Sequence, residues 1–118
     1  MIRNCSVTAV CAGFVLTLLS FSVSAETQVE ESQRLYRENC RDCHDDGSPN
    51  GEYTPMSLIQ AQWTRFFDRK YERSHRKVID EAHGGVPVTE AISPEVLEKI
   101  RTFVIDHAAD TDQPMTCG

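Results

Sequence analysis

The chain has 118 residues, 40% of them hydrophobic, and a formal net charge of −6. A chain of this length holds one small domain, and its acidic balance argues against nucleic acid or an anionic membrane as a partner. The sequence contains neither internal repeats nor a linker to a second domain.

Residues 1–25 have the pattern of a secretory signal peptide. Arg3 precedes a nearly continuous apolar run over residues 7–19, and small residues lie just before Ala25. We therefore expect cleavage after Ala25 and a periplasmic or otherwise exported protein of 93 residues. An uncleaved anchor is the alternative, because the 17 apolar or small residues 7–23 are at the short end of the spanning range of roughly 17–25. Residues 26–109 would then form one domain, and residues 110–118 a polar tail with the unpaired Cys117, either a free thiol or an intermolecular disulfide.

Residues 40–44 carry the most specific motif of the chain. Cys40, Cys43 and His44 form the C-x-x-C-H pattern of covalent c-type haem attachment. The two thiols would form thioether bonds to the porphyrin, and His44 would be the proximal ligand of the iron. We therefore predict one covalently attached haem c.

Two other interpretations of this motif have less support. A thioredoxin-like redox pair requires a βαβ setting, and the sequence indicates no convincing strands. A zinc site would require a second pair of ligands, which the chain lacks.

Three helices are expected after the signal segment, so the predicted fold class is all-α. The first covers residues 26–39, with Leu35 and Tyr36 as its main apolar residues. After a loop over residues 45–55, the second begins at Met56 or Gln60 and ends at about His83, before Gly84-Gly85. Its apolar face consists of Trp63, Phe66, Phe67, Tyr71, Val78 and Ile79.

The third helix has a clear start signal. Ser93 is a suitable N-cap and Pro94 a suitable first helical residue. The helix is expected to end near Ala109, and its amphipathic pattern consists of Val96, Leu97, Ile100, Phe103, Val104 and His107.

Basic residues recur on the opposite side of the second helix. Arg65, Arg69, Arg73 and Lys77 are spaced four residues apart, and residues 64–77 have a net charge of +4. A solvated helix face explains this stripe. The functional alternative is docking of an acidic redox partner, or a clamp for the haem propionates.

The order of these elements resembles that of the small monohaem class I c-type cytochromes. The resemblance covers the chain after residue 25, and Cys40, Cys43 and His44 match the family's haem-attachment residues. It implies a cytochrome c-like fold of about three helices around one haem, in which the first helix crosses the last through Tyr36 and Phe103. It further implies a single-electron carrier between exported or membrane-bound redox partners, and not an enzyme.

The chain departs from this family at the distal ligand. The family's methionine would lie in the turn Gly84-Gly85-Val86-Pro87, where Val86 cannot bind iron. We favour His75, on the flank of the apolar helix face, and keep His83 as the alternative ligand. Met56, Met115 or no side chain at all remain further options; an open site would indicate a ligand-binding, sensor or peroxidase-like haem protein.

Overall fold

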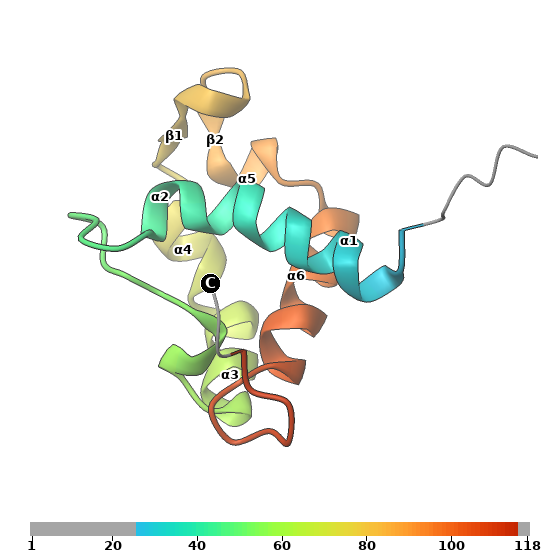
Figure 1. The fold of residues 1–118 in the computed structure, drawn as a ribbon. Coiled ribbons are helices and arrows are strands. Elements are labelled where there is room, and N and C mark those ends of the chain that lie inside the picture. The colour runs from blue at the N-terminus through green and yellow to red at the C-terminus, as the bar shows by residue number, and fades with distance from the viewer. Residues whose placement is uncertain (1–25, 116–118) are drawn as a thin grey trace, which may run out of the picture.

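The computed structural model describes residues 26–115. The predicted signal peptide and Cys117 lie outside the described residues. The described part is mostly helical, as predicted, and its two strands have two residues each (Figure 1). No helix in residues 26–115 combines the length and the apolar character needed to cross a membrane.

The first helix is longer than predicted and includes the cysteine motif. Helix α1 (Gln28–Tyr36) begins at Thr27, whose hydroxyl accepts a hydrogen bond from the N–H of Glu30 while the Glu30 carboxylate accepts from the N–H of Thr27. The backbone continues without a break through a π-helical segment, η1 (Arg37–Arg41), into α2 (Asp42–His44). Such π segments are frequent at functional sites, and this one contains the first cysteine of the motif.

The loop after the motif is held against the helices by two hydrogen bonds to backbone carbonyls. The Tyr36 hydroxyl donates to the carbonyl of Tyr53 at 2.9 Å, and the Trp63 indole donates to that of Pro55 at 2.7 Å. The loop ends in one 3₁₀ turn, η2 (Pro55–Ser57). The predicted loop over residues 45–55 is confirmed, apart from its last residue.

Our prediction of one long second helix is wrong beyond His75. Helix α3 (Gln60–Arg69) and helix α4 (Tyr71–His75) are separated at Lys70, whose φ of −118° departs from the helical value. Further on, the strands β1 (Ile79–Asp80) and β2 (Val86–Pro87) pair antiparallel around a 3₁₀ turn, η3 (Glu81–His83).

Local chemistry explains why this segment forms a hairpin instead of a helix. Gly84 and Gly85 have φ angles of 99° and 66°, which allow the chain to reverse between the strands. The Asp80 carboxylate accepts a hydrogen bond from the N–H of His83 and so closes the turn. Val78 and Ile79 are consequently 44% and 48% exposed and do not lie on a buried helix face.

The last helix confirms its predicted start. A short helix α5 (Val88–Ala91) precedes α6 (Pro94–Asp106), where the hydroxyl of Ser93 accepts a hydrogen bond from the N–H of Val96. Helix α6 ends three residues before the predicted end near Ala109.

The core lies where α1 crosses α6 (Figure 1). The rings of Tyr36 and Phe103 have centroids 5.6 Å apart, so the predicted contact between the two helices is present. Ile100 is fully buried in this core, and Met115 from the tail packs against it. Helix α3 also packs against α6 and contributes the buried Trp63.

Candidate functional site

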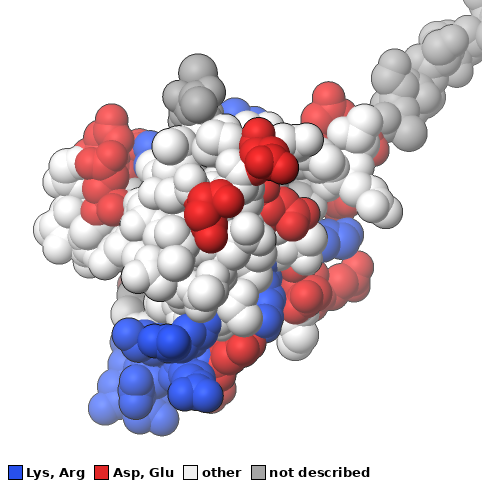
Figure 2. All heavy atoms as spheres, turned by 90° about the horizontal axis from the view of Figure 1, so that it is seen from below, with Lys and Arg blue, Asp and Glu red and all other residues white. Residues whose placement is uncertain are grey.

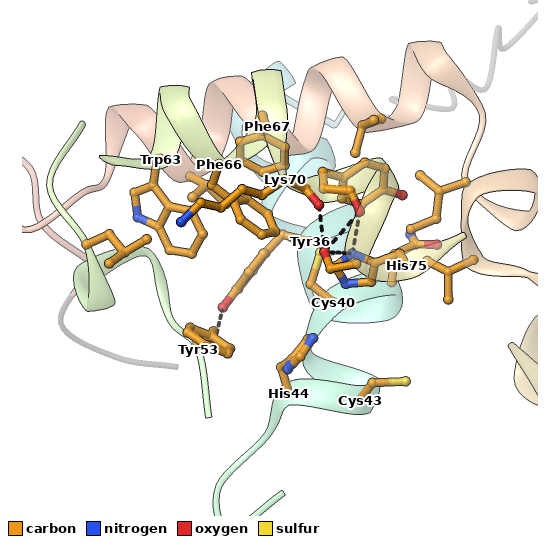
Figure 3. A pocket seen from close by; sticks show the side chains of 18 of the residues that line it. Tyr36, Cys40, Cys43, His44, Tyr53, Trp63, Phe66, Phe67, Lys70 and His75 are labelled. Atoms are coloured by element: carbon orange, nitrogen blue, oxygen red, sulfur yellow. Dashed lines mark hydrogen bonds between the residues drawn. The ribbon is translucent and has the colours of Figure 1, made fainter. Parts of the chain in front are cut away.

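A cavity of about 690 Å³ lies between the cysteine motif and helices α3 and α4. Ligand sites in proteins typically measure roughly 300–1,000 Å³ and are mainly apolar. Aromatic side chains likewise line much of this cavity (Figure 3). The cavity brings together the predicted attachment residues, the favoured distal ligand and most of the predicted apolar face of the second helix. Its lining includes Cys40, Cys43, His44, Trp63, Phe66, Phe67, Tyr71 and His75.

His44 is fixed by the loop that follows the motif. Its Nδ1 lies 2.9 Å from the carbonyl oxygen of Gly51, and the ring of Tyr53 packs edge-on at a centroid distance of 5.2 Å. Because a carbonyl oxygen can only accept, Nδ1 of His44 carries the hydrogen and Nε2 has a free lone pair. This is the tautomer that a metal-binding imidazole needs.

His75 has the same arrangement on the other side of the cavity. Its Nδ1 donates to the carbonyl of Tyr71 at 2.8 Å, which again leaves Nε2 free. The ring stacks on that of Tyr71 with centroids 4.9 Å apart. Burial, with a smaller contribution from His44, lowers the pKa of His75, so the imidazole is held neutral.

The two imidazoles face each other across the cavity (Figure 3). Their ring centroids lie 6.1 Å apart and their planes are inclined by 75°. Imidazole nitrogens bind zinc at about 2.0–2.1 Å, and a five-membered ring with bonds of about 1.3–1.4 Å has a radius of about 1.1 Å. Two imidazoles that bind one metal atom from opposite sides therefore have centroids about 6 Å apart, and the observed separation is compatible with that arrangement.

Both cysteines of the motif contribute to the cavity from one helical stretch. Burial raises the pKa of the Cys40 thiol to about 12. Burial, followed by the nearby carboxylates of Asp42 and Asp80, also raises the pKa of Cys43. Both thiols are thus held in the protonated form, and their spacing of three residues places them on the same side of the helix.

Tyr71 is a site residue that sequence reasoning assigned only to the apolar helix face. Its hydroxyl is buried in the cavity and has no hydrogen-bond partner among the described residues. Burial raises the pKa of Tyr71 to about 12. A buried hydroxyl without a partner in the protein is free to hydrogen-bond to a bound water or to a polar group of a ligand. Its position four residues before His75 is the sequence signal that could have identified Tyr71 as a support of that ring.

The structure does not bring the other predicted distal ligands to this cavity. His83 lies on the hairpin, where its Nδ1 is 2.8 Å from the carboxylate of the buried Asp80. Met56 and Met115 line a separate cavity of about 490 Å³ beside Arg41. Val86 lies in β2 and does not line either cavity.

One curated protein is similar to part of the chain. The chain is 32% identical over 68 residues to the ATP-dependent Clp protease adapter protein ClpS of Rhodospirillum centenum (strain ATCC 51521 / SW). The match covers 58% of this chain and 63% of the relative, so the chain spans less than two thirds of the relative's length. No protein-family model matches the chain, and no solved structure matches it.

This similarity contradicts the predicted function. The relative's name describes a protease adapter, which points away from a carrier of electrons between redox partners and from the haem-based sensor or peroxidase-like alternative. The same similarity contradicts the predicted classification as a metal-binding electron-transport protein. Residues 26–115 contain no group of three or more His, Cys, Asp or Glu side chains that could hold a metal ion on their own.

Proposed function

We propose that this chain is a haem-holding protein, with Cys40 and Cys43 as the covalent attachment points and His44 and His75 as the two axial ligands. The observation that carries the proposal is the pair of opposed imidazoles, each with Nδ1 bound to a backbone carbonyl and Nε2 free. The predicted cytochrome c-like arrangement, with α1 crossing α6 beside the cavity, belongs to the same proposal.

The chain's own residues have separable roles in this proposal. Cys40 and Cys43 would each form a thioether bond to a vinyl group, and the rigid helix would hold them at one edge of the cavity. Gly51 and Tyr71 would fix the two imidazoles through their carbonyl groups. The aromatic wall of α3 would exclude water, and a bound haem would supply an iron that the two imidazole nitrogens could bind.

The cavity fits a group of this kind on two further grounds. Its size and aromatic lining suit a large apolar plate, and a domain of this size gains an additional core element from it. The Tyr71 hydroxyl, which has no partner among residues 26–115, could hydrogen-bond to a polar ligand atom or to a water inside the cavity. Haem attachment by two thioethers and two imidazoles does not need a cluster of three protein ligands.

Attachment can be tested in the full chain, produced in a host that exports proteins and attaches haem c. We expect the intact mass to rise by one haem and the denatured band to stain for haem. The double variant Cys40→Ala, Cys43→Ala should lose both signals. Cys117→Ala is the matched control and should keep them; wild-type chain without added haem mass would overturn the proposal.

The axial ligands can be tested separately by optical and EPR spectra of the haem-bearing chain. His75→Ala should convert a low-spin spectrum to high-spin, because one imidazole is lost. His83→Ala should leave the spectrum unchanged, since His83 binds Asp80 on the hairpin. The opposite pattern would exclude His75 as the ligand while leaving covalent attachment intact.

A second candidate function is that of an adapter that binds an ATP-dependent Clp protease. The observation in its favour is the 68-residue similarity to the adapter of Rhodospirillum centenum. The purified Clp protease of that organism should then degrade a fluorescent reporter protein at a different rate when this chain is added. An unchanged rate with both haem-bearing and haem-free chain would remove the adapter candidate and would not affect the haem proposal.

A further inference from the structure

Six cationic side chains in and just after helices α3 and α4 have no ion-pair partner within residues 26–115, and we call them the basic face. All six are exposed, and the other cations of this part of the chain are paired with carboxylates, except for Arg37. The basic face consists of Arg65, Arg69, Lys70, Arg73, Arg76 and Lys77.

The fold makes this face more positive than the sequence suggests. Residues 64–77 contain two carboxylates. Asp68 forms an ion pair with Arg101 of α6 at 2.7 Å, so Glu72 is the one acidic residue of this segment without an ion pair. Seen from below, Lys and Arg side chains gather at one corner of the molecule, while several Asp and Glu side chains lie elsewhere on that face (Figure 2). A concentrated positive field on an otherwise acidic protein selects for acidic partners.

The break at Lys70 also changes the shape of the face. The predicted stripe along one helix line is wrong, because α3 ends at Arg69 and Lys77 lies beyond α4. The cations instead belong to α3, to Lys70 between the two helices, to α4 and to the two residues after it. Arg65 and Lys70 line the large cavity, so the basic face borders its opening.

Exposed apolar side chains adjoin the end of this face. Val78 and Ile79 directly follow Lys77 and are 44% and 48% exposed. Specific protein interfaces combine an apolar centre with a polar rim, whereas a simple polyanion needs no apolar contact. The net charge of −6 of the whole chain also disfavours extended polyanions, which would meet repulsion outside the basic face.

We infer that the basic face, together with Ile79, is a docking surface for an acidic protein surface. The partner's carboxylates would pair with the exposed guanidinium and ammonium groups, and an apolar side chain among them would contact Ile79. The inference goes beyond the haem proposal and does not rest on it, because none of these residues is a proposed haem ligand.

The test uses the full chain as purified, with or without haem, and two synthetic peptides, one all glutamate and one in which glutamate alternates with leucine. We expect the alternating peptide to bind more tightly and its affinity to fall steeply with salt. The double variant Arg69→Gln, Arg73→Gln should weaken binding about fivefold. Arg37→Glu changes the net charge by the same amount away from the basic face and should bind like wild type.

Two results would overturn the inference. Equal weakening by Arg37→Glu would show an effect of net charge alone. Binding to duplex DNA, to vesicles of anionic phospholipid or to a second copy of the chain that is tighter than binding to the alternating peptide would assign the face to another occupant. Ile79→Ser should remove the advantage of the leucine-containing peptide; an unchanged advantage counts against the apolar contact. Haem content measured on every variant separates these outcomes from a failure of the haem proposal.

Discussion

The rings of His44 and His75 lie opposite each other with centroids 6.1 Å apart, although they are 31 positions apart in the chain. Each ring is held in one tautomer by a carbonyl group close to it in sequence, that of Gly51 for His44 and that of Tyr71 for His75. The loop and the helix thus prepare two free nitrogens that point into one cavity (Figure 3).

The neutral, half-buried His75 should make the haem-free chain sensitive to acid. Because burial lowers its pKa in the folded state, the unfolded chain binds the proton more readily as the pH falls through about 6.5. The contribution of His75 to the free energy of unfolding is fully present above that pH and declines below it. Urea unfolding measured from pH 8 to pH 5 should show this decline.

The matched variants are His75→Gln and His83→Gln. His75→Gln should flatten the decline between pH 6.5 and the folded-state pKa, since glutamine does not titrate, and His83→Gln should retain the part that depends on His75. An unchanged slope in His75→Gln would contradict the burial of a neutral imidazole.

The two motif cysteines should differ in reactivity before haem attachment. Burial raises the pKa of Cys40 to about 12, and the thiolate is the reactive form. We expect iodoacetamide to modify Cys43 first in the haem-free chain, as followed by peptide mass spectrometry on a Cys117→Ala background. Equal rates at both positions would contradict the deeper burial of Cys40, and in the haem-bearing chain neither cysteine should react.

Ile100 should be a main determinant of stability. Its side chain is fully buried where α1 crosses α6, and Ile100→Ala should lower the free energy of unfolding by about 2–5 kcal/mol. Ile79→Ala is the matched control, because Ile79 is 48% exposed, and should change it by less than about 0.5 kcal/mol. Chemical denaturation of both variants at one pH provides the comparison.

The contribution of the α6 N-cap to the free energy of unfolding should be measurable on its own. Ser93→Ala removes the hydroxyl that accepts the N–H of Val96 at 3.3 Å, and should cost about 1 kcal/mol of stability. Ser93→Asp keeps an acceptor at the same position and should restore most of the loss. An alanine variant as stable as wild type would show that water replaces the hydroxyl at this helix end.

Local signals in the sequence predicted the beginnings of elements and the candidate attachment site. The C-x-x-C-H spacing placed two thiols and an imidazole on one helical stretch, and Ser93-Pro94 marked the start of the last helix, because both depend on contacts within a few residues. Residues 76–91 were not predictable in this way. Val78 and Ile79 continued the helical period of Trp63 and Phe66, yet Gly84 and Gly85 allowed a hairpin to form instead.

By itself the sequence determined the spacing of the candidate attachment residues Cys40, Cys43 and His44 and the largely helical character of residues 26–115. Only the tertiary structure decided which histidine faces His44. The break at Lys70 and the hairpin after Val78 leave His75 in the cavity wall and His83 beside Asp80, and no local pattern distinguishes the two. The physical reason is that this choice depends on contacts between α4 and the cysteine motif, which are distant in the chain and come together only when the core forms.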